Sequence, residues 1–273
     1  MTCIKPENIW RYIRIEAHKL SECEPMLISF YHAMLLKHNH LEHALSYILS
    51  KKILHSSISE MSIQEVIENA YNEDPSIIIA AAHDIHAVRH RDPTVDKYST
   101  PILYLKGFHA LQIYRITHWL WMQGRRALAI YLHNAMSVSF SVDIHPAAQI
   151  GKGVMLDHAT GTVIGETAVI ADNVSILQSV TLGGTGKING DRHPKIREGV
   201  MIGAGAKILG NIEVGCGAKI GAGSVVLQPV PPHTTVAGVP ASIVRKSNND
   251  IPLMERNQHF NGVTPGFESG DGI

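Results

Sequence analysis

The sequence predicts an α + β chain. Helices are expected over residues 1–140, a triangular coil of short parallel strands over 141–245, and a flexible tail over 246–273. Of the 23 glycines, 17 lie between Asp143 and Arg245, and this window contains no Phe, Trp or Tyr. Apolar residues recur at helical spacing before the window. Inside it, large aliphatic residues recur every six positions, which fits neither the period of a helix nor that of a flat strand.

The first 140 residues are predicted to form five to seven helices. A capping box begins at Ser62, where the hydroxyl can accept from an early helical N–H. Asp74–Pro75 and Thr100–Pro101 each place a capping oxygen before a proline that suits the first helical position. The apolar pattern that follows Pro101 is expected to end at Gly124, and a further helix is expected over 125–140.

The six-residue period predicts the coil, because each hexad can form one flat side with its aliphatic anchor pointing inward. A small or β-branched residue stands four positions after eleven of the anchors, from Ala148 after Ile144 to Ser224 after Ile220. A narrow prism has no room for rings, which explains the missing aromatics. The period survives two insertions, and thirteen anchors give a little over four coils. The anchors are Ile144, Ile150, Leu156, Ile164, Ile170, Ile176, Leu182, Ile196, Ile202, Ile208, Val214, Ile220 and Val226.

The two insertions indicate where function is added to the coil. The shorter one follows Leu156, so His158 stands directly before it. The longer one lies between Leu182 and Ile196 and is rich in glycine and basic residues, including Arg192 and His193. This segment is too polar to pack inside a prism, and we expect it to project as a loop.

The charge balance and composition exclude several classes of partner. Lys and Arg number 24 and Asp and Glu number 24, so the formal net charge is zero, which argues against a nucleic-acid partner and against a polybasic membrane surface. The longest purely apolar run, Ile77 to Ala82, is too short for a membrane span. The N-terminus shows no secretory signal, and three scattered cysteines fit a cytoplasmic location.

Several segments together resemble the serine O-acetyltransferase family, within the acyltransferases built on a left-handed parallel β-helix of hexapeptide repeats. They are DKYSTPILYLKGFHALQ from Asp96, DIHPAA from Asp143, LDHATG from Leu156, GDRHPKI from Gly190 and VAGVPA from Val236. The resemblance covers nearly the whole chain. It implies acetyl transfer from acetyl-CoA, a co-substrate rather than a bound cofactor, to the hydroxyl of L-serine as the first step of cysteine biosynthesis.

His158 is the expected catalytic base. A serine hydroxyl is a weak nucleophile, and a positioned base that removes its proton contributes about 10²–10⁴ in rate. Asp143 lies about one coil earlier, so its carboxylate can orient the imidazole and favour its charged form. Asp157, the direct neighbour of His158, is the alternative orienting residue, and the sequence does not decide between the two.

The resemblance also implies the binding residues. Arg192 and His193 would hold the carboxylate of serine, while Asp92 and Asp157 face its ammonium group. The acetyl-CoA groove needs small residues that let the pantetheine arm approach the backbone, and Lys219 can meet a phosphate. The expected groove residues are Gly184, Ala204, Gly205, Lys219 and Ala222.

Two other activities compete with this prediction. One is acetyl transfer to another hydroxyl acceptor on the same fold. The other is a zinc hydrolase like the β-helix carbonic anhydrases, for which His158 and His193 would supply two ligands. The expected third histidine is missing after His193, where Lys195 to Glu198 stand. Three protein ligands are usual for catalytic zinc, so no metal site is predicted.

The resemblance implies three kinds of association. L-Cysteine is expected to inhibit by binding in the serine site, since the two amino acids differ by one atom. The prisms are expected to form trimers with active sites between neighbours, and the helical domains to join two trimers. The tail, ending at Ile273, is expected to dock into O-acetylserine sulfhydrylase, because a free apolar C-terminus suits entry into a pocket.

Overall fold

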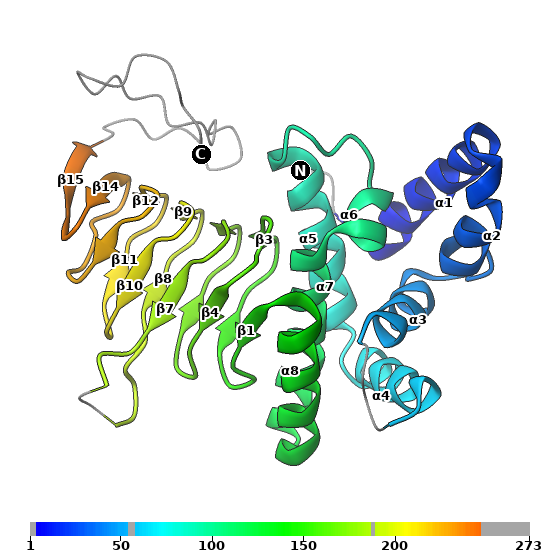
Figure 1. Cartoon of the computed structure of the whole chain (residues 1–273), viewed down its shortest axis with the longest axis horizontal. Coiled ribbons are helices and arrows are strands. Elements are labelled where there is room, and N and C mark those ends of the chain that lie inside the picture. Colours follow the sequence, from blue (N-terminus) through cyan, green and yellow to red (C-terminus); the bar gives the residue numbers. More distant parts are fainter. Residues whose placement is uncertain (1–3, 54–57, 187–188, 247–273) are drawn as a thin grey trace.

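In the computed structural model of the chain, a block of helices precedes a parallel β-solenoid (Figure 1). The structure describes residues 4–53, 58–186 and 189–246. No helix in these ranges is long and apolar enough to cross a membrane. The α-helices are α1 (Pro6–Cys23), α2 (Ile28–Tyr31), α3 (Leu41–Lys52), α4 (Glu60–Glu73), α5 (Ser76–Arg91), α6 (Ser99–Tyr104), α7 (Lys106–Met122) and α8 (Arg126–Phe140), with a 3₁₀ turn at Pro25–Leu27 and a π-helical turn at His32–Leu36.

Two predicted helix starts are wrong. α4 is capped by Ser59, whose hydroxyl accepts from the Ser62 amide at 3.1 Å, so Ser62 lies inside the helix rather than at its cap. α6 begins at Ser99, and its first amides are capped from a distance by the carboxylate of Glu16 on α1. A propensity pattern cannot reveal a cap that comes from another helix. Asp74 accepts from the Ser76 amide as expected, although Pro75 is the N-cap rather than the first helical residue, and α8 matches the helix expected over 125–140. The single helix expected after Pro101 is divided into α6 and α7, and the described residues contain eight α-helices instead of five to seven.

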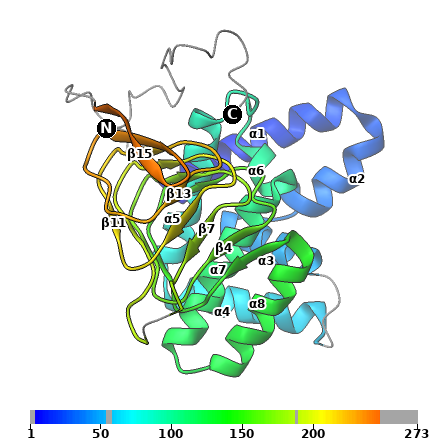
Figure 2. The same ribbon diagram turned by 60° about the vertical axis from the view of Figure 1, so that its left-hand side comes forward.

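The solenoid has three faces, seen end-on in Figure 2. Face 1 has the order β1-β4-β7-β10-β13, face 2 β11-β8-β5-β2, and face 3 β15-β14-β12-β9-β6-β3. All neighbours pair in parallel except β14 and β15, which close the end as an antiparallel pair. The strands are β1 (Val142–Ile144), β2 (Gln149–Ile150), β3 (Met155–Leu156), β4 (Thr162–Ile164), β5 (Val169–Ile170), β6 (Ser175–Ile176), β7 (Thr181–Gly183), β8 (Lys195–Ile196), β9 (Met201–Ile202), β10 (Lys207–Leu209), β11 (Glu213–Val214), β12 (Lys219–Ile220), β13 (Val225–Val226), β14 (Thr234–Gly238) and β15 (Ala241–Lys246).

The hexad anchors form the core of the prism as predicted, and twelve of the thirteen are buried. Ile150 is only partly buried. The coil extends further than predicted, to about five turns, because Val230 and Val236 are also buried at anchor positions. The six-residue period did not predict these two anchors, because Val230 follows Val226 by four residues instead of six.

The first insertion changes which residue of its coil points into the prism. Thr160, expected inside the prism, is exposed, and Ala159 is fully buried in its place. The backbones of His158 and Ala159 both take left-handed φ values, 53° and 62°. For residues other than glycine this costs about 1–2 kcal/mol each, and such strain is typical of functional sites.

A buried ionic network joins the helices to the solenoid. Asp84 on α5 accepts two bonds from Arg115 on α7, and its other oxygen accepts from the Val154 amide of the solenoid at 2.9 Å. Arg115 also donates to the carbonyl oxygens of Ile150 and Gly151. Figure 1 shows α5, α7 and α8 beside the first coil, with α1 to α4 farther from it. The network therefore fixes the helices relative to the strands that begin the predicted site.

Candidate active site

The predicted site residues gather at two corners of the prism. Corner A joins face 3 to face 1 and comprises residues 157–161, 177–180, 203–206 and 221–224. Corner B joins face 1 to face 2 and comprises residues 145–148, 165–168, 184–186, 189–194 and 210–212. The shorter insertion lies in corner A and the longer one in corner B, where its loop projects from the prism (Figure 1).

Corner A places His158 beside the Asp157 carboxylate, on which the charge of Asp92 also acts. The His158 side chain is 73% exposed, and its Nε2 lies 3.9 Å from Oδ1 of Asp157. Burial raises the pKa of the Asp157 carboxyl; the charge of His158 opposes this shift and that of Asp92 adds to it. Asp92 follows the end of α5 and accepts from the amide and hydroxyl of Thr94. The corner therefore holds an exposed imidazole next to a partly buried carboxylate whose pKa is raised.

The turn that carries His158 packs against the start of α7 at Gly107. A methyl group added there would lie 2.1 Å from the carbonyl oxygen of Leu156 and 3.0 Å from the Ala159 side chain. The neighbouring Lys106 ammonium also bonds the Thr160 hydroxyl. Sequence reasoning missed Gly107, which is marked only by being one of two glycines before the solenoid.

We predict that Gly107→Ala will shift the His158 turn. The added methyl meets backbone, which cannot rotate away, and overpacking of this kind costs about 1–3 kcal/mol. Turnover should fall by at least about tenfold, since a displacement near 1 Å can cost 10²-fold. Gly124→Ala serves as a control for a destabilising glycine replacement away from the turn: its φ of 76° makes alanine strained, but nothing lies within 4 Å of the added methyl. Equal turnover of the two variants would contradict the packing argument.

Three predicted cofactor residues share corner A with His158 and form a row along the prism axis. Ala204 and Gly205 lie in one coil and Ala222 in the next. The stacked corners are joined by bonds from Ser179 N to Thr160 O, from Gly205 N to Gln178 O and from Gly223 N to Ala204 O. The backbone of corner A is thus continuous along the prism from the small residues Ala204, Gly205 and Ala222 to the coil of His158. Lys219 lies on β12 of face 3, and Gly184 lies at corner B against the Arg192 side chain.

Corner B collects Arg192 and His193 in the longer insertion. Arg192 donates to Glu166 at 2.7 Å and to the carbonyl oxygen of Gly190. The Arg192 guanidinium lowers the pKa of Glu166. His193 is buried against Gly165, and a methyl group on that glycine would lie 2.0 Å from Nε2 of the ring. The missing side chain of Gly165 therefore leaves the space that the imidazole fills.

Asp143 lies in the middle of β1 on face 1, opposite Val163 of β4, and not in corner A with His158. Within the described residues its ionic partner is His133 on α8, whose Nε2 lies 2.8 Å from Oδ1 of Asp143. The Asp143 charge also acts on His145, whose pKa is lowered mainly by burial. Of the two carboxylates expected to orient His158, Asp143 and Asp157, the one nearer to the His158 ring within a single chain is therefore Asp157.

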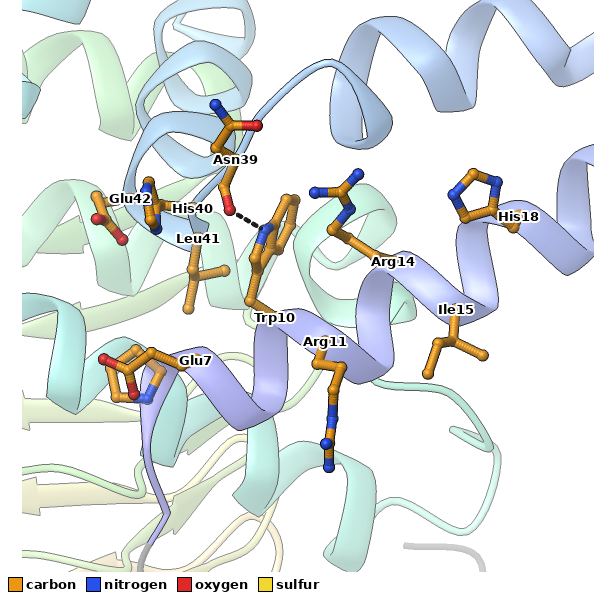
Figure 3. A pocket seen from close by; sticks show the side chains of 11 residues that line it. Glu7, Trp10, Arg11, Arg14, Ile15, His18, Asn39, His40, Leu41 and Glu42 are labelled. Atoms are coloured by element: carbon orange, nitrogen blue, oxygen red, sulfur yellow. Dashed lines mark hydrogen bonds between the residues drawn. The ribbon is translucent and has the colours of Figure 1, made fainter.

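Two cavities lie away from these residues. One, of about 550 Å³, lies between α1 and the start of α3, where the Trp10 indole donates to the Asn39 carbonyl oxygen (Figure 3). The other, of about 420 Å³, lies along face 2 and includes His118 and Gln149. Neither is lined by a predicted site residue. No group of three or more metal-ligating side chains is present among the described residues.

The tail residue Ile273, expected to bind a partner enzyme, lies outside the described residues.

The triangular solenoid with its two functional corners defines the class of protein. Residues 193–228 match the family described as "Bacterial transferase hexapeptide (six repeats)", and residues 9–113 match "Serine acetyltransferase, N-terminal". The chain is therefore an acyltransferase built on hexapeptide repeats.

Similar proteins identify its family. Serine acetyltransferase of Salmonella typhimurium is 70% identical over 273 residues, which is 100% of both chains. Two solved structures, titled "Serine Acetyltransferase- Complex with Cysteine" and "Serine Acetyltransferase- Complex with CoA", are each 64% identical, with TM-scores of 0.87 and 0.85. Each comparison covers 88% of this chain and 100% of the other. The chain belongs to the serine acetyltransferase family, whose reaction is acetyl transfer to serine.

Proposed function

We propose that this chain transfers the acetyl group of acetyl-CoA to the hydroxyl of L-serine with His158 as general base. The observation that carries the proposal is the exposed His158 imidazole beside the Asp157 carboxylate, on which the charge of Asp92 also acts, in the corner that continues to a row of small residues. A relative solved with CoA supports the donor, and family membership favours acyl transfer over a zinc hydrolase.

The chemistry follows from the position of His158. Its ring nitrogen removes the proton as the serine oxygen attacks the thioester carbonyl carbon. The tetrahedral intermediate then expels the thiolate of CoA, and the proton passes from the imidazole to sulfur. A thiolate leaves readily because its conjugate acid has a pKa of roughly 8.5. A backbone amide is the expected donor to the oxyanion, with Gly184 as the candidate.

Serine binding uses both corners. Asp92 and Asp157 supply negative charge for the ammonium group, while Arg192 and His193 supply donors for the carboxylate. These groups lie at opposite edges of face 1 within one chain. We therefore place the complete site between neighbouring prisms of a trimer, where corner A of one chain meets corner B of the next. In this arrangement Asp143 of the neighbour reaches His158, while Asp157 contacts it from the same chain.

A mixing experiment tests the shared site. His158→Ala inactivates corner A, and Arg192→Ala weakens corner B. Co-expression in equal amounts should restore about a quarter of the sites, because a random trimer pairs one intact corner of each kind at that frequency. Sedimentation of the wild-type chain measures the trimer and the expected dimer of trimers directly. Activity of the mixture equal to the average of the two single variants would place the site within one chain.

The acceptor is tested by CoA thiol release. Purified protein with acetyl-CoA should release thiol with L-serine and not with other hydroxyl compounds at equal concentration. Faster release with a different acceptor would favour the alternative acetyltransferase. L-Cysteine should compete with serine, since a relative has been solved with cysteine bound. Inhibition that added serine does not relieve would contradict a shared site.

The tail proposal has its own test. Deleting Ile273 should abolish association with O-acetylserine sulfhydrylase. The deletion removes the terminal apolar side chain and shifts the free carboxylate to the preceding residue. Substituting Ser247 by alanine, which leaves the terminus intact, is the control. Undiminished association after the deletion would remove the tail from the interface.

The cytoplasmic location remains a prediction.

A further inference from the structure

Thr167 in corner B contacts both residues expected to bind the carboxylate of serine. Its hydroxyl oxygen accepts from the backbone amides of Arg192 at 3.0 Å and His193 at 3.1 Å. The same oxygen lies 2.8 Å from Nδ1 of the His193 ring. The hydroxyl of a residue 25 positions earlier in the chain therefore binds the segment where the longer insertion returns to the prism.

The contacts at Nδ1 define the tautomer of His193. The Thr167 backbone amide lies 3.2 Å from Nδ1, and an amide N–H can only donate. Nδ1 is therefore an acceptor, and the proton of the neutral ring is on Nε2. The Thr167 hydroxyl accepts from both amides, and its own proton has two acceptors within reach, Nδ1 of His193 and the carboxylate of Asp191. Burial lowers the pKa of His193, and the charge of Arg192 adds to the effect, so the ring is held in this neutral form.

Other contacts hold the rest of the turn. The Lys195 ammonium donates to the carbonyl oxygens of Thr167 at 2.7 Å and His193 at 3.0 Å, and it pairs with Asp191. These bonds use Lys195 and backbone groups, whereas the two amides and the Nδ1 atom of the binding residues all meet the Thr167 hydroxyl. Valine has nearly the same shape as threonine but lacks this oxygen.

We propose that Thr167 is a positioning residue for serine: its hydroxyl fixes the backbone at Arg192 and His193, and its backbone amide sets the tautomer of His193. The inference rests on the proposed function, because it assumes that these two residues bind the carboxylate of serine. Thr167 itself touches no substrate. Its effect should therefore appear in serine binding and leave the acetyl-CoA groove at corner A unchanged.

Steady-state kinetics of Thr167→Val and Thr167→Ser test the proposal. We expect Thr167→Val to lower kcat/KM for serine by about 10²-fold, chiefly through KM, since misplacing binding groups by about 1 Å can cost this much. The KM for acetyl-CoA should stay within about twofold, and Thr167→Ser, which keeps the hydroxyl, should restore most of the loss. Thr235→Val on β14, far along the prism, is the matched control.

Kinetics separates failure of the inference from failure of the proposed function. If the wild-type chain acetylates serine and Thr167→Val does so equally well, Thr167 has no positioning role. If the wild-type chain does not acetylate serine, the proposed function fails instead. Nitrogen NMR of the wild-type protein with labelled histidine, with His193 assigned through His193→Gln, tests the tautomer even if Thr167→Val does not fold. A protonated Nδ1 in the neutral ring would contradict the proposal.

Discussion

Replacing His158 with alanine should lower turnover by about 10³-fold and leave the protein folded. The loss follows from removing the base that the corner presents to the serine hydroxyl, and general-base help is worth about 10²–10⁴. The fold should persist because the side chain is 73% exposed and fills no part of the core. The KM values for both substrates should change much less than turnover, since His158 acts on the proton rather than on the bound groups.

The measurement is initial velocity of CoA thiol release at saturating substrates, with circular dichroism and sedimentation to verify folding and assembly. His43→Ala, a histidine on α3 in the helical region, is the matched control and should retain wild-type turnover. Turnover of His158→Ala within a few-fold of the control would refute the general-base assignment while leaving family membership intact.

The largest expected change in stability comes from Asp84→Ala. The Asp84 carboxylate is fully buried and Arg115 is 7% exposed, so the substitution leaves a guanidinium buried without its counter-ion. It also removes the acceptor of the Gln112 amide and of the Val154 backbone amide. Breaking a buried pair from one side costs about 3–5 kcal/mol. The free energy of unfolding should fall by that amount.

Urea denaturation at neutral pH measures this change, with Glu213→Ala as the control. Glu213 forms an ion pair with Arg197 in which both side chains are about half exposed. Such exposed pairs contribute about 0–1 kcal/mol, because water competes for both charges. If Asp84→Ala loses no more stability than Glu213→Ala, the helices and the solenoid must be held together by apolar packing instead.

Most of the solenoid could be predicted from the sequence because its pattern is local. Each hexad carries its own anchor and its own small residue, so Ile164, Ile170 and Ile176 are predicted and found buried by the same rule. The six-residue spacing gave wrong predictions where the chain departs from it. An inserted pair of residues exchanged Thr160 for Ala159 inside the prism, and Val230 was missed after a four-residue step.

The helical region was less predictable because distant residues decide its details. The first amides of α6 are capped by Glu16, which lies more than 80 positions earlier in the sequence. The apolar pattern there predicts one helix, yet the chain breaks at Leu105 into α6 and α7. The break places Gly107 against the His158 turn, a contact that no local signal reveals.

The separation of glycines from aromatics and the six-residue period determined by themselves that this chain is a helical block followed by a prism. These patterns involve residues close together in the sequence, and each turn of a repeating backbone is formed by such a local segment. Only the tertiary structure decided which of the expected residues meet. It brought the charge of Asp92 to act on Asp157, and it placed Asp143 beside His133 and the Thr167 hydroxyl against the amides of Arg192 and His193. Residues on different coils and helices become neighbours through the winding of the prism and the docking of α5 and α8, which no spacing in the sequence measures.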